Sequence, residues 1–108
     1  MLLSTTDELQ GFEITDYLGL AHGAVVSGAN IMRDVMATVT DFVGGRSAAY
    51  EEELETSRES ALRELSDQAQ RLGADAVVGV SIDFEVIGGR GAMIMVTATG
   101  TAVRLRKI

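Results

Sequence analysis

The sequence predicts an α+β fold in a single domain over residues 1–108, with the elements in the order β-α-α-β-β. Three observations lead to this prediction. Apolar and polar side chains alternate near both ends of the chain, which is the strand period. Between these ends, apolar residues recur at steps of three and four, as on one face of a helix. The chain has 108 residues, 46% of them apolar, and no proline, which suits one small domain with uninterrupted elements.

The first predicted strand covers residues 12–26, FEITDYLGLAHGAVV. Phe12 and Ile14 alternate with polar residues, and the segment is rich in β-branched and aromatic side chains. Gly19 and Gly23 interrupt the alternation, and we interpret both as bulges or bends.

Two helices are predicted next. Residues 31–43 carry an amphipathic pattern, with Asn30 as the N-cap. A longer pattern from Ala48 to Leu72 spans about 37 Å at 1.5 Å per residue and is followed by Gly73 at the expected C′ position. We therefore expect one short helix and one long helix.

The segment between these helices is Gly44, Gly45, Arg46 and Ser47. A glycine pair here has two interpretations, a phosphate-binding loop or a joint between helices. The glutamates at 51–53 would repel a phosphate, and the P-loop lysine is missing. We interpret the segment as a structural joint, with Gly44 as a left-handed cap and Ser47 as an N-cap. Arg46 is then available to an acid of its own or a neighbouring subunit.

The last two strands, residues 80–86 and a segment starting at Ala92, form a predicted hairpin. Pairing Ile87 with Met93 makes one face apolar and leaves both acids on the other, whereas a one-residue slip would mix the faces. The predicted pairs are Phe84 with Val96, Ile82 with Ala98, Glu85 with Met95 and Asp83 with Thr97. An odd-numbered loop or a bulge is expected at Gly88–Ala92.

No residue from Gly91 to Val103 is charged, so the last strand is predicted at the sheet centre. The three-stranded antiparallel sheet then has the order 1-3-2, with the helices on one face. Both outer strands are long and free of proline, and such edges tend to find partners. We therefore expect a homo-oligomer.

Four segments carry a resemblance to a known family: SGANIMRD, VGGRSAAYEEEL, LGADAVVGVSIDFEV and MIMVTATGTAVRL. They resemble the YbjQ-like family of small bacterial proteins, often labelled heavy-metal-binding domains, from about Ser4 to Leu105. The resemblance implies a long-helix layer on an antiparallel sheet, similar to dodecin-type subunits, and assembly into rings, commonly pentamers. It carries over no agreed set of ligand residues. The family often has an acid where this chain has Ser81.

Four residues are candidate metal ligands: Asp83 and Glu85 for a hard cation, Met95 for a soft ion, and His22 as an imidazole. Each has a simpler interpretation. Alternating acids are usually the solvated side of a strand, methionine usually fills a core, and a lone histidine is usually structural. With no cysteine and one histidine, a single subunit cannot offer a closed soft-metal site.

The net charge of −7 argues against nucleic acid as a partner, because a phosphate backbone attracts clustered Lys and Arg. No apolar run approaches the roughly 20 residues of a membrane span, and the N-terminus lacks the basic region of a secretory signal. We therefore expect no membrane insertion and a cytoplasmic location.

The function favoured by these observations is an oligomeric protein that binds a metal ion or small ligand at subunit interfaces. The alternative is a structural or interaction module whose ring presents a surface to a protein partner. An enzyme is not expected, because no nucleophile–base pair or cofactor fingerprint is visible, and no cofactor is predicted.

Overall fold

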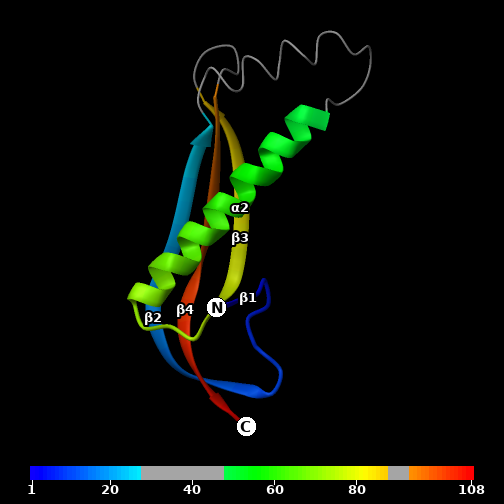
Figure 1. The fold of residues 1–108 in the computed structure, drawn as a ribbon. Coiled ribbons are helices and arrows are strands. Elements are labelled where there is room, and N and C mark those ends of the chain that lie inside the picture. The colour runs from blue at the N-terminus through cyan, green and yellow to red at the C-terminus, as the bar shows by residue number, and fades with distance from the viewer. Residues whose placement is uncertain (28–47, 88–92) are drawn as a thin grey trace.

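The computed structural model describes residues 1–27, 48–87 and 93–108. In these residues one helix runs obliquely across one face of a four-stranded mixed sheet (Figure 1). The elements are β1 (Leu2–Leu3), β2 (Phe12–Ser27), α2 (Ala48–Arg71), β3 (Ala76–Ile87) and β4 (Met93–Lys107). The predicted α+β class is therefore confirmed.

The strand order is β1-β3-β4-β2, so the last strand lies between the other two long strands, as predicted from its uncharged stretch up to Val103. The prediction of three strands, all antiparallel, was wrong. β1 adds a fourth strand parallel to β3, with Leu2 beside Ala76 and Leu3 beside Val77. Two residues are too short to show any alternation, so the sequence pattern held no sign of this strand.

The hairpin register is the predicted one from Ser81 to Ile87. Ile87 pairs with Met93, Phe84 with Val96 and Glu85 with Met95. The connecting segment, residues 88–92, lies outside the described residues.

The long helix is also confirmed, and it ends one residue earlier than predicted. Gly73 follows it with φ +83°. The Gly73 amide donates to the Gln70 carbonyl at 3.0 Å, and the Ala74 amide donates to the Ala69 carbonyl at 3.1 Å. These two bonds form a Schellman motif, which satisfies the last helical carbonyls.

The other predicted helix, over residues 31–43, lies outside the described residues. The same holds for the joint of Gly44, Gly45, Arg46 and Ser47. Neither prediction is tested here.

The main core lies between α2 and the sheet. Ala61, Leu65 and Ala69 of the helix are fully buried against Val96 and Ala98 of β4 and their neighbours. Alanines at three of these positions let the helix approach the sheet closely, since small side chains keep the two backbones near each other.

The two glycines that interrupt the first strand serve different purposes. Gly19 has φ +120° beside a register shift between Tyr17 and Gly19, so the predicted bulge is confirmed there. For Gly23 the bulge prediction was wrong, because its pairing with Ala98 is regular. A Cβ on Gly23 would lie 2.2 Å from the Ala61 carbonyl oxygen, so the helix backbone itself requires glycine here.

A second, smaller core lies on the opposite side of the sheet, near the C-terminal end of β4. Ala76, Val78 and Val103 are buried there beneath Leu9 and Ile14, with Leu105 beside them. The N-terminal segment and the start of β2 cross this end of the sheet (Figure 1). The prediction of one covered and one bare face therefore applies only to the half of the sheet nearer the β3–β4 connection.

β3 contains a bulge at Gly79, where its register against β4 shifts between Val78 and Ser81. Gly79 has φ +62°, a left-handed conformation that suits glycine. The Gly79 amide donates to the Thr6 carbonyl at 2.9 Å, and the Val80 amide donates to the Ser4 carbonyl at 3.0 Å. The N-terminal segment thus satisfies both amides of the bulge.

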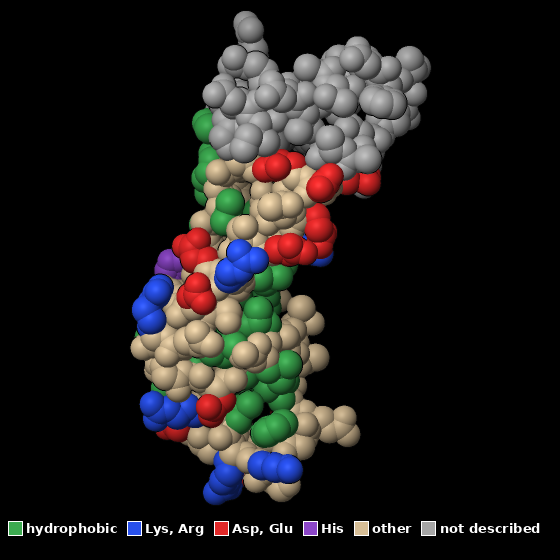
Figure 2. Space-filling view, in the orientation of Figure 1, with side chains coloured by type: hydrophobic (Ala, Val, Ile, Leu, Met, Phe, Trp, Pro, Cys, Tyr) green, Lys and Arg blue, Asp and Glu red, His purple; other side chains and the backbone are tan. Residues whose placement is uncertain are grey.

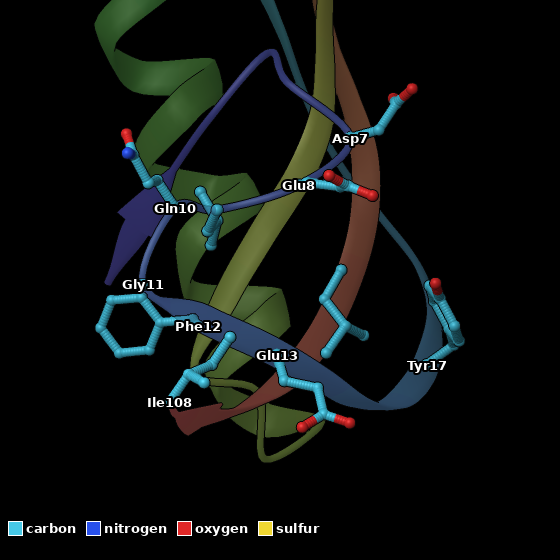
Figure 3. A pocket seen from close by; sticks show the side chains of 10 residues that line it. Asp7, Glu8, Gln10, Gly11, Phe12, Glu13, Tyr17 and Ile108 are labelled. Atoms are coloured by element: carbon cyan, nitrogen blue, oxygen red, sulfur yellow. The ribbon is translucent and has the colours of Figure 1, made fainter.

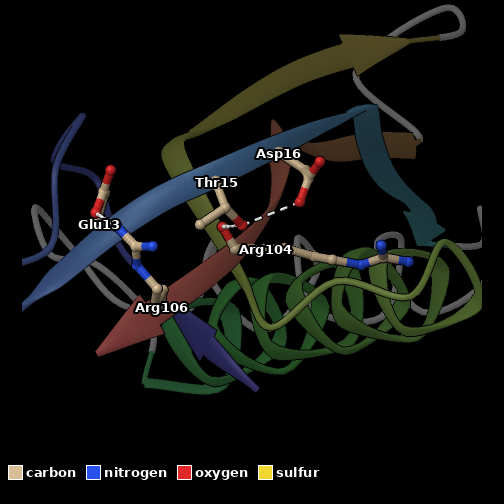
Figure 4. A network of polar contacts seen from close by, with 5 residues as sticks. All are labelled: Glu13, Thr15, Asp16, Arg104 and Arg106. Carbon is tan, nitrogen blue, oxygen red and sulfur yellow. Dashed lines mark hydrogen bonds and ion pairs between the residues drawn. The ribbon is translucent and has the colours of Figure 1, made fainter. Parts of the chain in front are cut away.

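A polar network closes the bulge at the start of β2 (Figure 4). Thr15 is the extra residue between Ile14 and Asp16, and its hydroxyl lies 3.0 Å from the Asp16 carboxylate and 3.4 Å from the Arg104 carbonyl oxygen. Arg106 pairs with Glu13 nearby. These contacts tie the basic end of β4 to β2.

Candidate functional site

Toward the β3–β4 connection, none of the described residues covers the face of the sheet opposite α2, and we call this surface the open face. It consists of three rows that cross the strands in register. The rows are Val26–Met95–Glu85, Ala24–Thr97–Asp83 and His22–Thr99–Ser81, with Leu20 and Thr101 continuing beyond them. Its centre is thus a threonine column on β4, with acids on the β3 side and His22 on the β2 side.

All four candidate metal ligands lie on the open face. His22, Asp83 and Glu85 are exposed, and Met95 is half-buried. Met95 lies directly beside Glu85 as predicted, whereas β4 separates His22 from both acids. The structure therefore places these residues on one surface without bringing them together.

The spacing rules out a metal site in which a single chain uses His22 with these acids. Neighbouring strands are about 4.8 Å apart, so His22 and Asp83 are separated by roughly 10 Å in the direction across the strands, and Asp83 also lies one row further along the sheet. In the described parts of the chain, no group of three His, Asp or Glu residues is close enough to hold a metal ion. The sequence also contains no cysteine.

The residues that the sequence analysis missed are the threonines of the central column, Thr97, Thr99 and Thr101. Their spacing in TATGT was visible, but hydroxyls carry no metal or catalytic signature of their own. They make the middle of the open face flat and weakly polar, with small side chains.

Two edges of the sheet flank the open face. β2 forms one edge, since β4 is its only strand partner among residues 1–27, 48–87 and 93–108. The other edge is β3 beyond Val80, because β1 and the segment Ser4–Thr6 cover β3 only up to that residue. Exposed edges of this length are templates for a further strand.

One amide on the β2 edge already has a partner. The His22 amide donates to the Gln68 side-chain oxygen at 2.5 Å, so this N–H is turned away from β4. Since every second residue of an edge strand turns its amide outward, Ala24 and Val26 share this orientation.

Large apolar side chains remain exposed around these edges. Leu20 and Val26 on β2 are 80% and 49% exposed, and Val86 and Phe84 on β3 are 61% and 50% exposed. Apolar patches next to free strand edges typically mark protein interfaces.

A cleft of about 780 Å³ lies at the other end of the sheet, between the N-terminal segment and β2. Its lining includes Asp7, Glu8, Phe12, Tyr17 and Ile108. Figure 3 shows Phe12 and Ile108 at one end and Tyr17 at the other, with the acids between them along the rim. The lining groups point apart and do not converge on one point, so the cleft offers no assembled chemistry.

The outer side of α2 carries many acids, which Figure 2 shows gathered toward its N-terminal half. Arg58 pairs with Glu55 there. No helix in the described part of the chain combines the length and apolar character that a membrane span requires.

Comparison with known proteins gives a consistent result. A family model described as "Putative heavy-metal-binding" matches residues 1–106. The UPF0145 protein BH1111 of Halalkalibacterium halodurans is 52% identical over 107 residues, which cover 99% of this chain and 98% of that protein. A crystal structure from Pediococcus pentosaceus, of a protein of unknown function in the DUF74 family, has a TM-score of 0.62 at 18% identity and covers 98% of both chains. This last likeness supports the fold.

Proposed function

The chain belongs to the YbjQ-like family, and on that premise we propose that it forms a closed homo-oligomer that binds a metal ion or small ligand between its subunits. The resemblance stated above implies a pentamer or a multiple of it. The proposal assigns the protein a binding role and not a catalytic one. Within the described residues, the exposed imidazole of His22 has no side-chain partner that could position it for catalysis.

The observation that carries the oligomer is the unsatisfied surface of the single chain. Two strand edges are free, and the apolar residues beside them are exposed. The largest fully buried side chains are only Leu65, Val77, Val96 and Val103. The radius of gyration is 17.1 Å, whereas about 13 Å is typical of a compact domain of this size. A partner copy would bury the surface that one chain leaves open.

The available metal-ligand groups determine which class of metal ion the protein could bind. The described part of one chain offers carboxylates, one imidazole and thioethers, on the same face but apart. These groups do not fit a closed heavy-metal site within a subunit, since structural zinc normally takes four Cys or His ligands. Symmetry repeats them once per subunit, so a metal would find enough ligands only where subunits meet. Carboxylate oxygens there favour hard cations over thiophilic ones.

Native mass spectrometry of gently purified protein tests both parts, because it reports subunit number and bound mass together. We expect a closed oligomer, a multiple of five chains, at micromolar concentration. Calorimetric titration of that oligomer with Zn²⁺, Cu⁺ and Mg²⁺ in a non-chelating buffer should show no submicromolar, stoichiometric site for Zn²⁺ or Cu⁺.

A protein that remains monomeric at micromolar concentration in sedimentation would overturn the proposal. A tight Zn²⁺ or Cu⁺ site abolished by His22→Ala or Met95→Ala would show that the chain is a heavy-metal binder after all. A ring that carries neither metal nor small ligand would favour the second candidate, a module that presents its surface to a protein partner.

A further inference from the structure

We infer, on the basis of the oligomer proposed above, that subunits join head to tail through their sheets, with the free edge of β3 in one copy pairing with the edge of β2 in the next. This pairing places His22 of one subunit beside Asp83 of its neighbour, with Glu85 of the neighbour one row away. The open faces of the copies then form one continuous surface, and each interface holds one imidazole and two carboxylates.

The directions of the strands permit this junction. β2 and β3 are both antiparallel to β4, so they run parallel to each other. A second copy can therefore continue the sheet in the same orientation, without being turned over. The result is a heterologous contact, which closes into a ring when the rotation between subunits allows it.

The hydrogen-bonding pattern agrees on both edges. On β2 the outward amides belong to residues whose side chains lie on the open face, as the bond from His22 to Gln68 shows. Because His22 turns its amide away from β4, its partner Thr99 turns its backbone groups toward β3, where it pairs with Ser81. By the same alternation Asp83 and Glu85 bond to β4, so Ile82 and Phe84 turn their backbone groups outward. In a parallel pair, an outward residue bonds to the two residues that flank its direct neighbour. Open-face side chains of the two copies therefore meet on the same side.

The extent of the free edges fixes the register. The N-terminal segment occupies β3 as far as Val80, so a neighbour can pair only with residues 81–87. On β2 the regular stretch starts at Leu20, after the bulge at Gly19. Full use of both stretches gives four rows on the open face, which are Ser81–Leu20, Asp83–His22, Glu85–Ala24 and Ile87–Val26.

The same register buries apolar surface on the α2 side. Phe84 falls beside Gly23 of the neighbour, and Val86 falls beside Val25. Phe84 and Val86 are the two large β3 side chains left exposed in the single chain. Forming the junction breaks the hydrogen bond from the His22 amide to the Gln68 side chain, and a carbonyl of the neighbour's β3 becomes the acceptor instead.

Charge favours this junction over its symmetric alternative. If two β3 edges paired with each other, Asp83 and Glu85 of both copies would lie side by side, and like charges directly opposite are destabilising. In the head-to-tail junction, Asp83 meets His22 and Glu85 meets Ala24, neither of which is an acid. The isologous β3 contact is therefore disfavoured.

The junction also creates the ligand set that one chain lacks. One imidazole nitrogen and two carboxylates make a site for a divalent cation of hard or intermediate character, such as Mn²⁺. These three groups converge only when the neighbouring copy is present, since β4 separates them within a chain.

Cysteine pairs test the junction directly, because the native sequence contains no cysteine. The double variant His22→Cys, Asp83→Cys should form disulfides between copies under mild oxidation. Adjacent strands bring Cα atoms to about 4.8 Å, within disulfide reach, whereas about 10 Å separates the two positions inside one chain. Denaturing electrophoresis should show a ladder of covalent multimers that ends at the ring size. A matched control, His22→Cys with Glu59→Cys, should give none, because Glu59 is exposed on the outer side of α2, opposite the helix face that packs on the sheet.

The outcomes separate the junction from the oligomer. If the native protein is monomeric, both proposals fail. If it is oligomeric and the pair gives no ladder, the junction alone is wrong. Dimers formed by Asp83→Cys alone, or by Asp83→Cys with Glu85→Cys, would show β3 edges meeting symmetrically and would also overturn it.

Mn²⁺ titration of the oligomer tests the composite site. His22→Ala and Asp83→Asn should each weaken binding by at least tenfold, as loss of a ligand does, and Asp7→Asn should leave it unchanged. Absence of Mn²⁺ binding to the native oligomer, or binding that survives both variants, would refute the cation site. The edge pairing would then be judged by the cysteine crosslinks alone.

Discussion

Gly23 shows how a single residue sets the distance between the helix layer and the sheet. A Cβ there would lie 2.2 Å from the Ala61 carbonyl oxygen and 2.7 Å from the Leu65 amide nitrogen. Both are backbone atoms of α2, which cannot move away without shifting the whole helix. Gly100, on β4, is crowded differently, since the nearest atom to its would-be Cβ is a Val77 methyl at 2.5 Å.

We therefore expect Gly23→Ala to lower the free energy of unfolding by about 3 kcal/mol, the upper end of the cost of overpacking. Gly100→Ala should cost about 1 kcal/mol less, because a valine side chain can rotate. Urea denaturation of both variants measures the difference. Equal losses, or a larger loss for Gly100→Ala, would show that α2 adjusts its position more easily than its contacts suggest.

The sequence alone could assign some of the candidate metal ligands to a face of the sheet, but not all of them. Asp83, Glu85 and Met95 could be assigned to one face because strict alternation runs through an uninterrupted hairpin. His22 could not be related to them, because the β2 register passes through two bulges before reaching it. Each bulge reverses the face that every later side chain occupies, and no local pattern reveals how many bulges there are.

At the scale of elements, β3 and the N-terminal segment depend on each other. The Gly79 bulge leaves two successive amides turned away from β4, and carbonyls of Thr6 and Ser4 accept from them. The Ser4 amide in turn donates to the Val77 carbonyl at 2.9 Å. This exchange fastens the start of the chain to the sheet and covers the edge there.

Gly79→Ala should destabilise the protein by about 1 kcal/mol, because alanine is strained in the left-handed region. Space is not the cause, since the only atom near a Cβ at this position is an Asp7 carboxylate oxygen at 4.0 Å. Gly79→Asn is the matched control and should cost less than half as much, because asparagine tolerates this conformation. Thermal unfolding compares the two, and an asparagine variant as unstable as the alanine variant would contradict a conformational origin.

The elements that could be predicted are those with long, repetitive patterns. The hairpin register followed from the alternation of apolar and polar residues. The end of α2 followed from the glycine at position 73. β1 could not be predicted, because Leu2–Leu3 gains its strand geometry only from the β3 edge. The second core was missed for the same reason, since Leu9 lies in a segment without regular structure and is partly buried only by tertiary contact.

At the scale of the whole molecule, two exposed phenylalanines provide a matched test of the proposed junction. Phe84 lies on the free edge of β3 and is 50% exposed, and Phe12 lies in the terminal cleft and is 41% exposed. The two residues are matched in type and exposure, and only Phe84 lies at the proposed junction.

Phe84→Ser should raise the concentration at which the oligomer dissociates by about tenfold, which corresponds to about 1.4 kcal/mol per contact and is reasonable for burying the exposed half of a phenylalanine. Phe12→Ser should leave that concentration unchanged. Sedimentation velocity across a dilution series measures both. If the Phe12 variant dissociates and the Phe84 variant does not, the interface lies at the terminal cleft instead of at the sheet edges.

The bulge at Gly79 changes which β3 residues turn their backbone groups toward the free edge. Before it, Val77 and Gly79 turn their backbone groups outward, and after it the outward positions fall on even numbers such as 82 and 84. Removing one residue here would exchange the two sets along the whole free edge, so the acids would carry the outward amides. If subunits join as proposed, a relative that lacks this residue would present an incompatible edge and would not form mixed oligomers with this chain, however similar its sequence elsewhere.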